Sequence, residues 1–406
     1  MAQKLKFGNG TFATKEGSTL AYNDENNNYK PLPFTTTRNS IGTRVNKEGL
    51  IEVVGRDVPR IDYTDSADGV LLLENAATNL ATYSQDYTHS SWNKVNSSGS
   101  TLPNVTPNYG ISPDGTQNAD RIQVSRASGV GDFSSIYKSI TVSSSNRGLS
   151  VWLKSLSGTP TILITNNNGV YVSQQITTEW VRYVLDLGVG TLTELQLSVV
   201  GSNFVQGVSE SADFLAWGYQ LETGVASSYI PTNGSTVTRQ ADTASGAGNS
   251  EVFNDSQGVL FADISSQNDS STKLISLAST SGSENTVWIG YANGVYGIIR
   301  SNGVTTVETN IVPTQSNEIT KCAILYSNSN VKFYVNGFNL FEDTNISMPI
   351  GLDQLRFSRK GGSLPFYGKT KELGYYDEIL TDLELETLTS YRTLNELVTE
   401  LNLNTL

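Results

Sequence analysis

The sequence is poor in charge and in the residues on which much protein chemistry depends. Its 27 Lys+Arg and 39 Asp+Glu make up 16% of 406 residues, against about 25% in ordinary globular chains. The net charge of −12 disfavours a groove that follows nucleic-acid phosphates, so we expect no nucleic-acid partner. One His and one Cys exclude a Cys/His zinc site and an intrachain disulfide framework. A catalytic triad with a histidine base would have to use His89, which lies in the polar segment Tyr87–Ser91.

Long hydrophobic runs are also missing. No apolar stretch reaches the length of about 18 residues that a membrane-spanning helix needs, so we expect no membrane partner. The segment Met1–Phe7 lacks the apolar core of a secretory signal. We therefore expect a protein that is made in a cytosol and is soluble or built into a particle.

Small polar residues take the place of the missing charge. The chain has 48 Ser, 43 Thr, 36 Asn and 36 Gly, a composition typical of strands joined by many turns. We predict an all-β fold, with an N-terminal extended arm, two β-sandwich (jelly-roll) domains and a short C-terminal helix. The predicted boundaries are 1–80 for the arm, 81–235 for the first sandwich, 236–250 for a linker, 251–380 for the second sandwich and 381–406 for the helix.

Charge separates the predicted arm from the rest of the chain. Residues 1–60 carry 9 Lys+Arg and 6 Asp+Glu, whereas the other 346 residues carry 18 and 33. A basic start before a long acidic body indicates different partners for the two ends.

Alternation of apolar and polar residues predicts the strands of both sandwiches. In the second sandwich, Val331, Phe333 and Val335 should face one way and Tyr334 the other, and Asn336-Gly337 should form the hairpin turn. The strands predicted there span residues 259–264, 274–278, 286–291, 295–300, 304–311, 318–326, 331–335 and 354–359.

The C-terminal segment changes to a helical pattern. Thr381 and Glu384 form a capping box, and apolar residues follow at spacings of three and four. We predict an amphipathic helix of about 20 residues, interrupted near Ser390, that packs on its own domain; self-association is the alternative. The apolar residues are Leu385, Leu388, Tyr391, Leu394, Leu397 and Leu401.

Several specific motifs resemble segments of bacteriophage virion-surface and fibre proteins. The first set is Phe34–Ile51, Pro59–Tyr63, Gly69–Glu74 and Thr78–Leu80. The second set resembles the carbohydrate-binding-module-like sandwich of the same proteins and comprises Asp114–Thr116, Val151–Lys154, Thr178–Tyr183, Trp217–Glu222, Ser228–Thr232 and Thr238–Asp242. One departure is Asn75–Ala77, where the resemblance leads us to expect a basic residue for local ion pairing.

The third block resembles the concanavalin A-like, laminin-G-like lectin fold through Val331–Gly337, Phe366–Gly368 and Tyr375–Asp382. The resemblances imply a non-enzymatic bacteriophage virion protein: a head- or tail-attached fibre, spike or capsid decoration. Its N-terminal arm would attach to other virion proteins, its outer sandwich would bind a host-surface or environmental polysaccharide, and it would form a homotrimer. We expect most of the motifs to hold the domains and the arm together, without contacting a ligand.

Glycan binding requires an aromatic ring that stacks on the C–H face of a sugar, with polar groups nearby for its hydroxyls. Our candidates are Trp288, Tyr291, Tyr334 and Asn336. The alternative for each ring is packing on a neighbouring strand or subunit.

Calcium is the one cofactor that the sequence leaves open. It prefers clustered oxygen ligands, which Asp255, Asp263, Asn268 and Asp269 could supply.

Two further functions compete with the glycan-binding fibre. A purely structural decoration protein without a ligand predicts that Trp288, Tyr291 and Tyr334 are all buried or at subunit contacts. A capsule-degrading glycosidase needs two carboxylates about 5–10 Å apart. The close acidic alternation of Asp382, Glu384 and Glu386 falls in the predicted helix, where electrostatics of the helix start explain it better.

Overall fold

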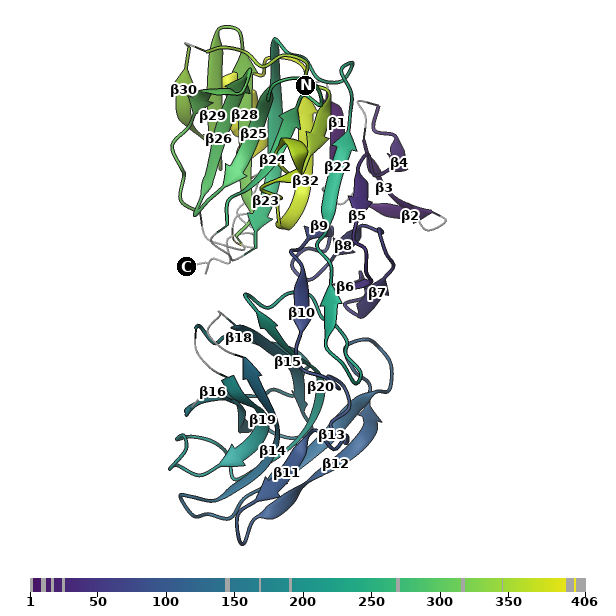
Figure 1. The fold of residues 1–406 in the computed structure, drawn as a ribbon, viewed down its shortest axis with the longest axis vertical. Coiled ribbons are helices and arrows are strands. Elements are labelled where there is room, and N and C mark those ends of the chain that lie inside the picture. Colours follow the sequence, from purple (N-terminus) through teal and green to yellow (C-terminus); the bar gives the residue numbers. More distant parts are fainter. Residues whose placement is uncertain are drawn as a thin grey trace.

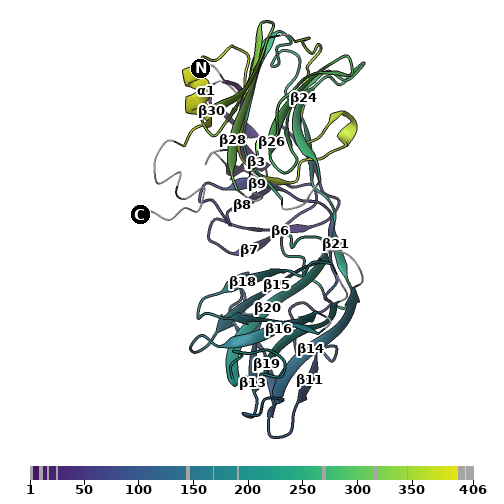
Figure 2. The same ribbon diagram turned by 90° about the vertical axis from the view of Figure 1, so that its left-hand side faces the viewer.

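The computed structural model confirms the all-β prediction. Two β-sandwiches are stacked along the long axis of the molecule, with short strands between them (Figures 1 and 2). We call them the middle sandwich and the C-terminal sandwich. The structure describes residues 3–8, 12–15, 18–23, 26–142, 147–167, 169–189, 192–267, 271–314, 318–344, 346–391 and 398.

The middle sandwich packs two five-stranded antiparallel sheets around its own core. The alternation that predicted its strands places Leu149, Val151 and Leu153 in that core and Trp152 on the opposite face of the sheet. One sheet has the order β11 (Asn93–Asn96), β14 (Phe133–Val142), β19 (Leu192–Val200), β16 (Thr161–Asn167) and β17 (Val170–Gln175). The other has the order β12 (Thr101–Gly110), β13 (Ala119–Ser125), β20 (Ser211–Thr223), β15 (Arg147–Ser155) and β18 (Val181–Asp186).

The C-terminal sandwich is larger and recruits strands from the N-terminal part of the chain. One sheet has the order β30 (Phe338–Asp343), β29 (Asn330–Val335), β28 (Thr320–Ser327), β23 (Gln257–Ser266), β32 (Gly368–Tyr376), β9 (Val70–Leu73) and β8 (Arg60–Asp62), and β1 (Gln3–Gly8) also pairs with β32. The facing sheet has the order β27 (Val304–Glu308), β26 (Val295–Ser301), β25 (Thr286–Tyr291), β24 (Lys273–Ala278), β31 (Gln354–Arg356), β22 (Thr243–Ala247) and β5 (Thr35–Thr37).

The N-terminal segment therefore differs from the extended arm that the sequence predicted. Leu5 and Phe7 of β1 are buried in the core of the C-terminal sandwich, where the Phe7 ring packs edge-to-face on Phe34 at 5.2 Å between centroids. The physical reason is that β32 offers a free edge, and the apolar alternation of β1 lets it complete that sheet. The rest of the segment forms small sheets, namely β2 (Ala13–Lys15) with β3 (Ser18–Tyr22) and β4 (Tyr29–Pro31), and the hairpin β6 (Gly42–Val45) with β7 (Ile51–Val54).

The predicted linker 236–250 also contains strands. β21 (Val237–Arg239) pairs with β10 (Ala77–Asn79), and β22 pairs with β5 and β31. The chain thus passes between the sandwiches twice, and the two passages are hydrogen-bonded to each other through β10 and β21.

The C-terminal helix α1 (Asp382–Thr389) begins with the predicted capping box. It ends at Ser390, which has an extended backbone, as the predicted interruption requires. Leu385 is buried, and α1 covers one face of β28 and β29, so the helix packs on its own domain. The predicted apolar positions Leu394, Leu397 and Leu401 lie outside the described residues. In the described part of the chain, no helix has the length and apolarity needed to cross a membrane.

The predicted hairpin turn is present between β29 and β30. Val335 pairs with Phe338, so Asn336 and Gly337 form a two-residue loop. Both have positive φ angles, 48° and 89°, which Asn and Gly adopt more readily than other residues.

Replacing Thr381 by Ala should lower the free energy of unfolding by about 1 kcal/mol, because the Thr381 side chain accepts from the Glu384 backbone N–H at 3.3 Å. Denaturant unfolding and hydrogen exchange of α1 measure the effect. Thr381→Ser is the control, since it retains the capping hydroxyl. Equal stability of the Ala and Ser variants would show that the cap does not hold α1 on the sheet.

Candidate functional site

The three aromatic glycan-binding candidates are all buried. Trp288, Tyr291 and Tyr334 are 3%, 3% and 4% exposed. None presents the open ring face that stacking on a sugar requires, which is the outcome that the structural alternative predicts. Asn336 is half-buried, and its side-chain oxygen accepts from the Lys321 backbone N–H at 3.1 Å, which supports the turn.

Tyr334 and Trp288 are each covered by groups that period-two alternation cannot locate, whereas Tyr291 lies in the core of the C-terminal sandwich. Tyr334 does lie on the opposite face from Phe333, as predicted, but α1 covers that face and Asp382 accepts from the Tyr334 hydroxyl at 3.1 Å. Burial and this hydrogen bond raise the pKa of Tyr334 to about 12. Trp288 lies under the guanidinium groups of Arg300 and Arg359, at 5.2 and 5.9 Å from the ring centroid.

The acidic alternation at the start of α1 is structural, as expected. Asp382 binds Lys332, which holds the pKa of the Asp382 carboxyl below its usual value. Glu384 accepts from the Thr381 backbone N–H at 2.8 Å, which lowers the pKa of Glu384 in the same way. Both carboxylates are used in holding the helix.

The proposed calcium ligands do not form a cluster where the structure describes them. Asp255 accepts from the backbone N–H groups of Gly351 and Leu352, at 2.6 and 2.9 Å. Asn268 and Asp269 lie outside the described residues. Among the described residues, no group of three or more His, Cys, Asp or Glu side chains could hold a metal ion.

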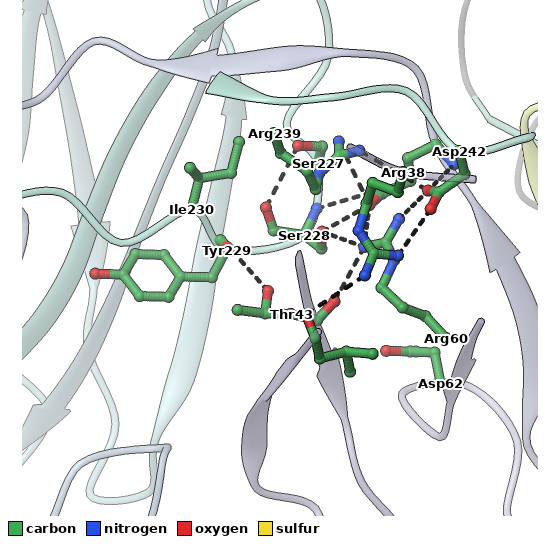
Figure 3. Close-up of polar contacts among 12 residues, drawn as sticks. Arg38, Thr43, Arg60, Asp62, Ser227, Ser228, Tyr229, Ile230, Arg239 and Asp242 are labelled. Atoms are coloured by element: carbon green, nitrogen blue, oxygen red, sulfur yellow. Dashed lines mark hydrogen bonds and ion pairs between the residues drawn. The ribbon is translucent and has the colours of Figure 1, made fainter. Parts of the chain in front are cut away.

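The motifs that carry the phage resemblance meet in one buried arginine–carboxylate cluster between the sandwiches (Figure 3). We define the cluster as Arg38, Arg60, Glu74, Arg239 and Asp242, whose side chains are 0–6% exposed. Arg38 and Glu74 follow β5 and β9, Arg60 begins β8, Arg239 ends β21 and Asp242 precedes β22, so five separate elements converge on the cluster.

Arg60 lies at the centre of the cluster. It donates to Glu74 at 2.7 Å and also binds Asp242. Arg38 donates to the other oxygen of Asp242 at 3.0 Å, and Arg239 lies 3.5 Å from Glu74. The basic partner that the resemblance placed near Asn75–Ala77 is therefore supplied by Arg60 and Arg239, from other parts of the chain.

The cluster also fastens the chain that leaves the middle sandwich. Ser228 donates its backbone N–H and its hydroxyl to Glu74, at 2.8 and 2.6 Å. Burial opposes ionisation of Glu74, but Arg239, Arg60 and the two Ser228 hydrogen bonds outweigh it and hold the pKa of Glu74 well below its usual value. Glu74 is thus an ionised, buried carboxylate that joins the two sandwiches, and we call this arrangement the charged clamp.

A second set of motif residues fixes the β6–β7 hairpin to the middle sandwich. Trp217, Trp152 and Tyr229 pack together on the outer face of the β15–β20 sheet, and Ile51 of β7 packs against them. Thr43 donates its hydroxyl to the Tyr229 carbonyl at 2.6 Å (Figure 3). These contacts confirm that the motifs hold the domains together.

The same outer sheet face carries a partly exposed polar row farther from the junction, which we call the polar ladder. Its members are Asn104 on β12, Arg121 and Gln123 on β13, Asp213 on β20, and the 47% exposed ring of Tyr109. Arg121 and Gln123 both donate to Asp213, and Asn104 donates to Gln123 at 3.1 Å.

The ladder combines the groups that recognise sugars. The Arg121 guanidinium lies 4.8 Å from the centroid of the Tyr109 ring, and a groove of about 490 Å³ runs beside Asn104, Gln123 and Asp213. Amides, a carboxylate and a guanidinium can pair with hydroxyls that both donate and accept. The sequence analysis missed the ladder, although the alternation of Arg121, Gln123 and Ser125 with Ile122 and Val124 was its signal.

A separate cleft of about 370 Å³ lies beside the arginine–carboxylate cluster. Its walls come from the middle sandwich, the C-terminal sandwich and the β6–β7 hairpin, represented by Trp152 and Arg182, by Gln267 and Lys369, and by Arg44. This volume is within the range of about 300–1,000 Å³ for small-molecule sites, which often occur at domain interfaces. The shape of the cleft depends on the cluster that holds its walls together.

Comparisons with known proteins give distant structural likeness alone. No protein-family model and no curated protein sequence matches the chain. The carbohydrate-binding module CBM40 of the Ruminococcus gnavus IT-sialidase, solved with α2,3-sialyllactose, is 15% identical; the match covers 36% of this chain and 94% of that one, with a TM-score of 0.31. Domain 4 of the Geobacillus stearothermophilus arabinanase AbnA, solved with arabinotriose, is 17% identical, covering 41% and 83%, with a TM-score of 0.31.

Domains LG4-5 of the mouse laminin α1 chain are 10% identical, covering 64% of this chain and 92% of that one, with a TM-score of 0.26. At these identities and TM-scores the likeness carries no argument about function.

Proposed function

We propose that the chain is a non-enzymatic surface protein of a bacteriophage particle that binds a glycan on the polar ladder. The observation that supports glycan binding is the ladder itself, a partly exposed row of mutually hydrogen-bonded amide, carboxylate and guanidinium groups beside the exposed Tyr109 ring. Such a row offers hydrogen bonds to hydroxyls at the edge of a sugar and a ring for its C–H face.

The phage assignment rests on the specific motifs and on their common role in the structure. Residues from Phe34–Ile51, Pro59–Tyr63, Gly69–Glu74 and Thr238–Asp242 supply the arginine–carboxylate cluster. A buried charged clamp of this kind suits a protein whose two sandwiches must keep a fixed arrangement on a particle surface. Attachment to other virion proteins and a homotrimeric state belong to this proposal.

Two details of the proposal differ from the expectations of the sequence. The glycan site is on the middle sandwich instead of the outer one, because Trp288, Tyr291 and Tyr334 are buried. Attachment to the particle is not assigned to a free arm of residues 1–80, because β1, β5, β8 and β9 belong to the C-terminal sandwich. Display of many copies would strengthen weak single-site binding by avidity.

A glycan array probed with the multimerised full chain tests the ladder. We expect binding to one class of sugar, and a loss of about tenfold or more in Asp213→Ala, because hydrogen bonds to a charged group contribute about 1.5–3 kcal/mol. Glu179→Ala is the matched control, since Glu179 is an exposed carboxylate of the same sandwich outside the groove.

Two results would contradict the proposal. Equal binding by wild type and Asp213→Ala would remove the site from the ladder. Silence of the folded full chain on the array would favour the purely structural decoration protein, which the burial of Trp288, Tyr291 and Tyr334 independently supports.

A further inference from the structure

The cleft between the sandwiches contains a partly buried arginine, Arg182, that forms no direct ion pair among the described residues. Arg182 donates to the Ser150 hydroxyl at 2.9 Å and to the Ser227 carbonyl at 2.6 Å, and its guanidinium lies 4.5 Å from the Trp152 ring centroid. In the described part of the chain, no carboxylate comes within ion-pair distance of Arg182, and its Nε–H has no acceptor. Burial lowers the pKa of Arg182, and the nearby carboxylates Glu222, Glu74 and Asp62 oppose that shift in part.

Two more side chains of the cleft have a buried polar atom without a hydrogen-bond partner among the described residues. Arg44 donates to the Ile61 carbonyl at 3.2 Å and to Glu52 at 3.1 Å, but its buried Nε–H has no acceptor among the described residues. The side-chain oxygen of Gln267 is a buried acceptor that has no donor there. Such groups are costly in a folded protein unless a ligand or water satisfies them.

The carboxylates of the cleft are already engaged. Asp62 accepts from the backbone N–H groups of Val45 and Thr64, at 2.8 and 3.0 Å. Asp65 binds Lys369 at the mouth, and Glu74 is held in the arginine–carboxylate cluster. The cleft atoms that lack a hydrogen-bond partner among the described residues are therefore the Nε–H donors of Arg44 and Arg182 and the side-chain oxygen of Gln267.

We propose that this cleft binds an acidic sugar residue, whose carboxylate pairs with Arg182 and whose hydroxyls reach Gln267. A carboxylate accepts from the planar guanidinium and supplies a counter-charge in direct contact with it. A hydroxyl donates to the free oxygen of Gln267, which a simple anion such as acetate cannot do. The site goes beyond the proposed function, because it is separate from the polar ladder and selects for charge.

Calorimetric titration of the full chain with glucuronate, with glucose and acetate as comparison ligands, tests the proposal. We expect glucuronate to bind with a dissociation constant of about 1 mM or tighter, and glucose and acetate to bind at least about tenfold more weakly. Arg182→Gln should weaken glucuronate binding about tenfold or more, since it removes a hydrogen-bonded charge pair. Higher salt should weaken the binding further.

Gln267→Leu is the second variant, because it removes the Gln267 side-chain oxygen, which has no donor among the described residues. We expect it to fold as the wild type and to weaken glucuronate binding about threefold to tenfold, the effect of one neutral hydrogen bond. It keeps the test decisive if Arg182→Gln does not fold.

The outcomes separate this site from the ladder. Glucuronate binding that survives Asp213→Ala and falls in Gln267→Leu supports the cleft. Absence of glucuronate binding, equal affinity for glucose, or unchanged affinity in Gln267→Leu overturns the proposal. A glycan-array signal that depends on Asp213 would leave the proposed function standing in each of those cases.

Discussion

A fragment of residues 250–406 should fail to fold, although it contains the whole lectin-like motif set. It lacks β1, β5, β8 and β9, which complete both sheets of the C-terminal sandwich. The missing segments bury Leu5, Phe7, Phe34, Ile61, Leu71 and Leu73 in its core. Each such side chain contributes about 1.5–3 kcal/mol, so together they rival the net stability of a domain, about 5–15 kcal/mol.

Near-ultraviolet circular dichroism and thermal unfolding measure this expectation. A fragment of residues 76–235 is the matched control, because both sheets of the middle sandwich lie within it, and we expect it to unfold cooperatively. Adding residues 1–79 in trans should restore structure to 250–406. A cooperative unfolding transition of 250–406 alone would show that the N-terminal strands are accessory.

Replacing Glu74 by Ala should lower the free energy of unfolding by about 3–5 kcal/mol, because it leaves buried cations without their counter-charge. Arg60 would lose its 2.7 Å partner, Arg239 its nearest carboxylate, and Ser228 both of its acceptors. Asp65→Ala is the control. It removes the partly exposed Asp65–Lys369 pair, which we expect to contribute about 1 kcal/mol or less.

Lowering the pH of the wild-type protein should reduce its free energy of unfolding gradually, for the same reason. The pKa of Glu74 is lowered in the folded protein from an ordinary value of about 4.5, so the unfolded chain takes up the proton first. The stabilisation by the ionised Glu74 carboxylate is complete at pH values above the unfolded-state pKa, and it is lost as the pH falls toward the folded-state pKa. Denaturant unfolding of Glu74→Gln should therefore vary less with pH in this window. If the free energy of unfolding of Glu74→Ala were within about 1 kcal/mol of the wild-type value, Glu74 would not stabilise the junction between the two sandwiches.

Short-range patterns predicted most of the C-terminal sandwich. The strand predicted over 286–291 is β25, and the turn at Asn336-Gly337 and the capping box at Thr381 are present as expected. Each depends on a few neighbouring residues, whose alternation or turn preference is visible in the sequence.

Long-range packing explains what the sequence analysis missed. β1 shows an alternation of Leu5 and Phe7 with lysines, but its partner β32 lies more than 350 residues away, and no local pattern predicts that pairing. In the same way, alternation placed Tyr334 correctly on its strand but could not show that α1 covers it. The burial of Trp288, Tyr291 and Tyr334 could not be predicted, because exposure depends on which distant element covers a sheet face.

The role of the charged motif residues also depends on long-range packing that the sequence does not reveal. Arg60, Glu74 and Asp242 are far apart in the sequence and carry charges that could have marked a ligand site, yet they neutralise each other in a buried cluster. The groups that we propose for ligand binding are instead on the polar ladder and in the cleft, and local patterns do not distinguish them from other polar residues.

The most direct test of this account is one glycan array probed side by side with the wild-type full chain, Asp213→Ala and Gln267→Leu. Two separable losses are expected: binding to the class of sugar that the ladder recognises is lost in Asp213→Ala, and binding to acidic glycans is weakened in Gln267→Leu. Absence of any bound glycan by the folded wild type, or identical profiles for all three proteins, would contradict it.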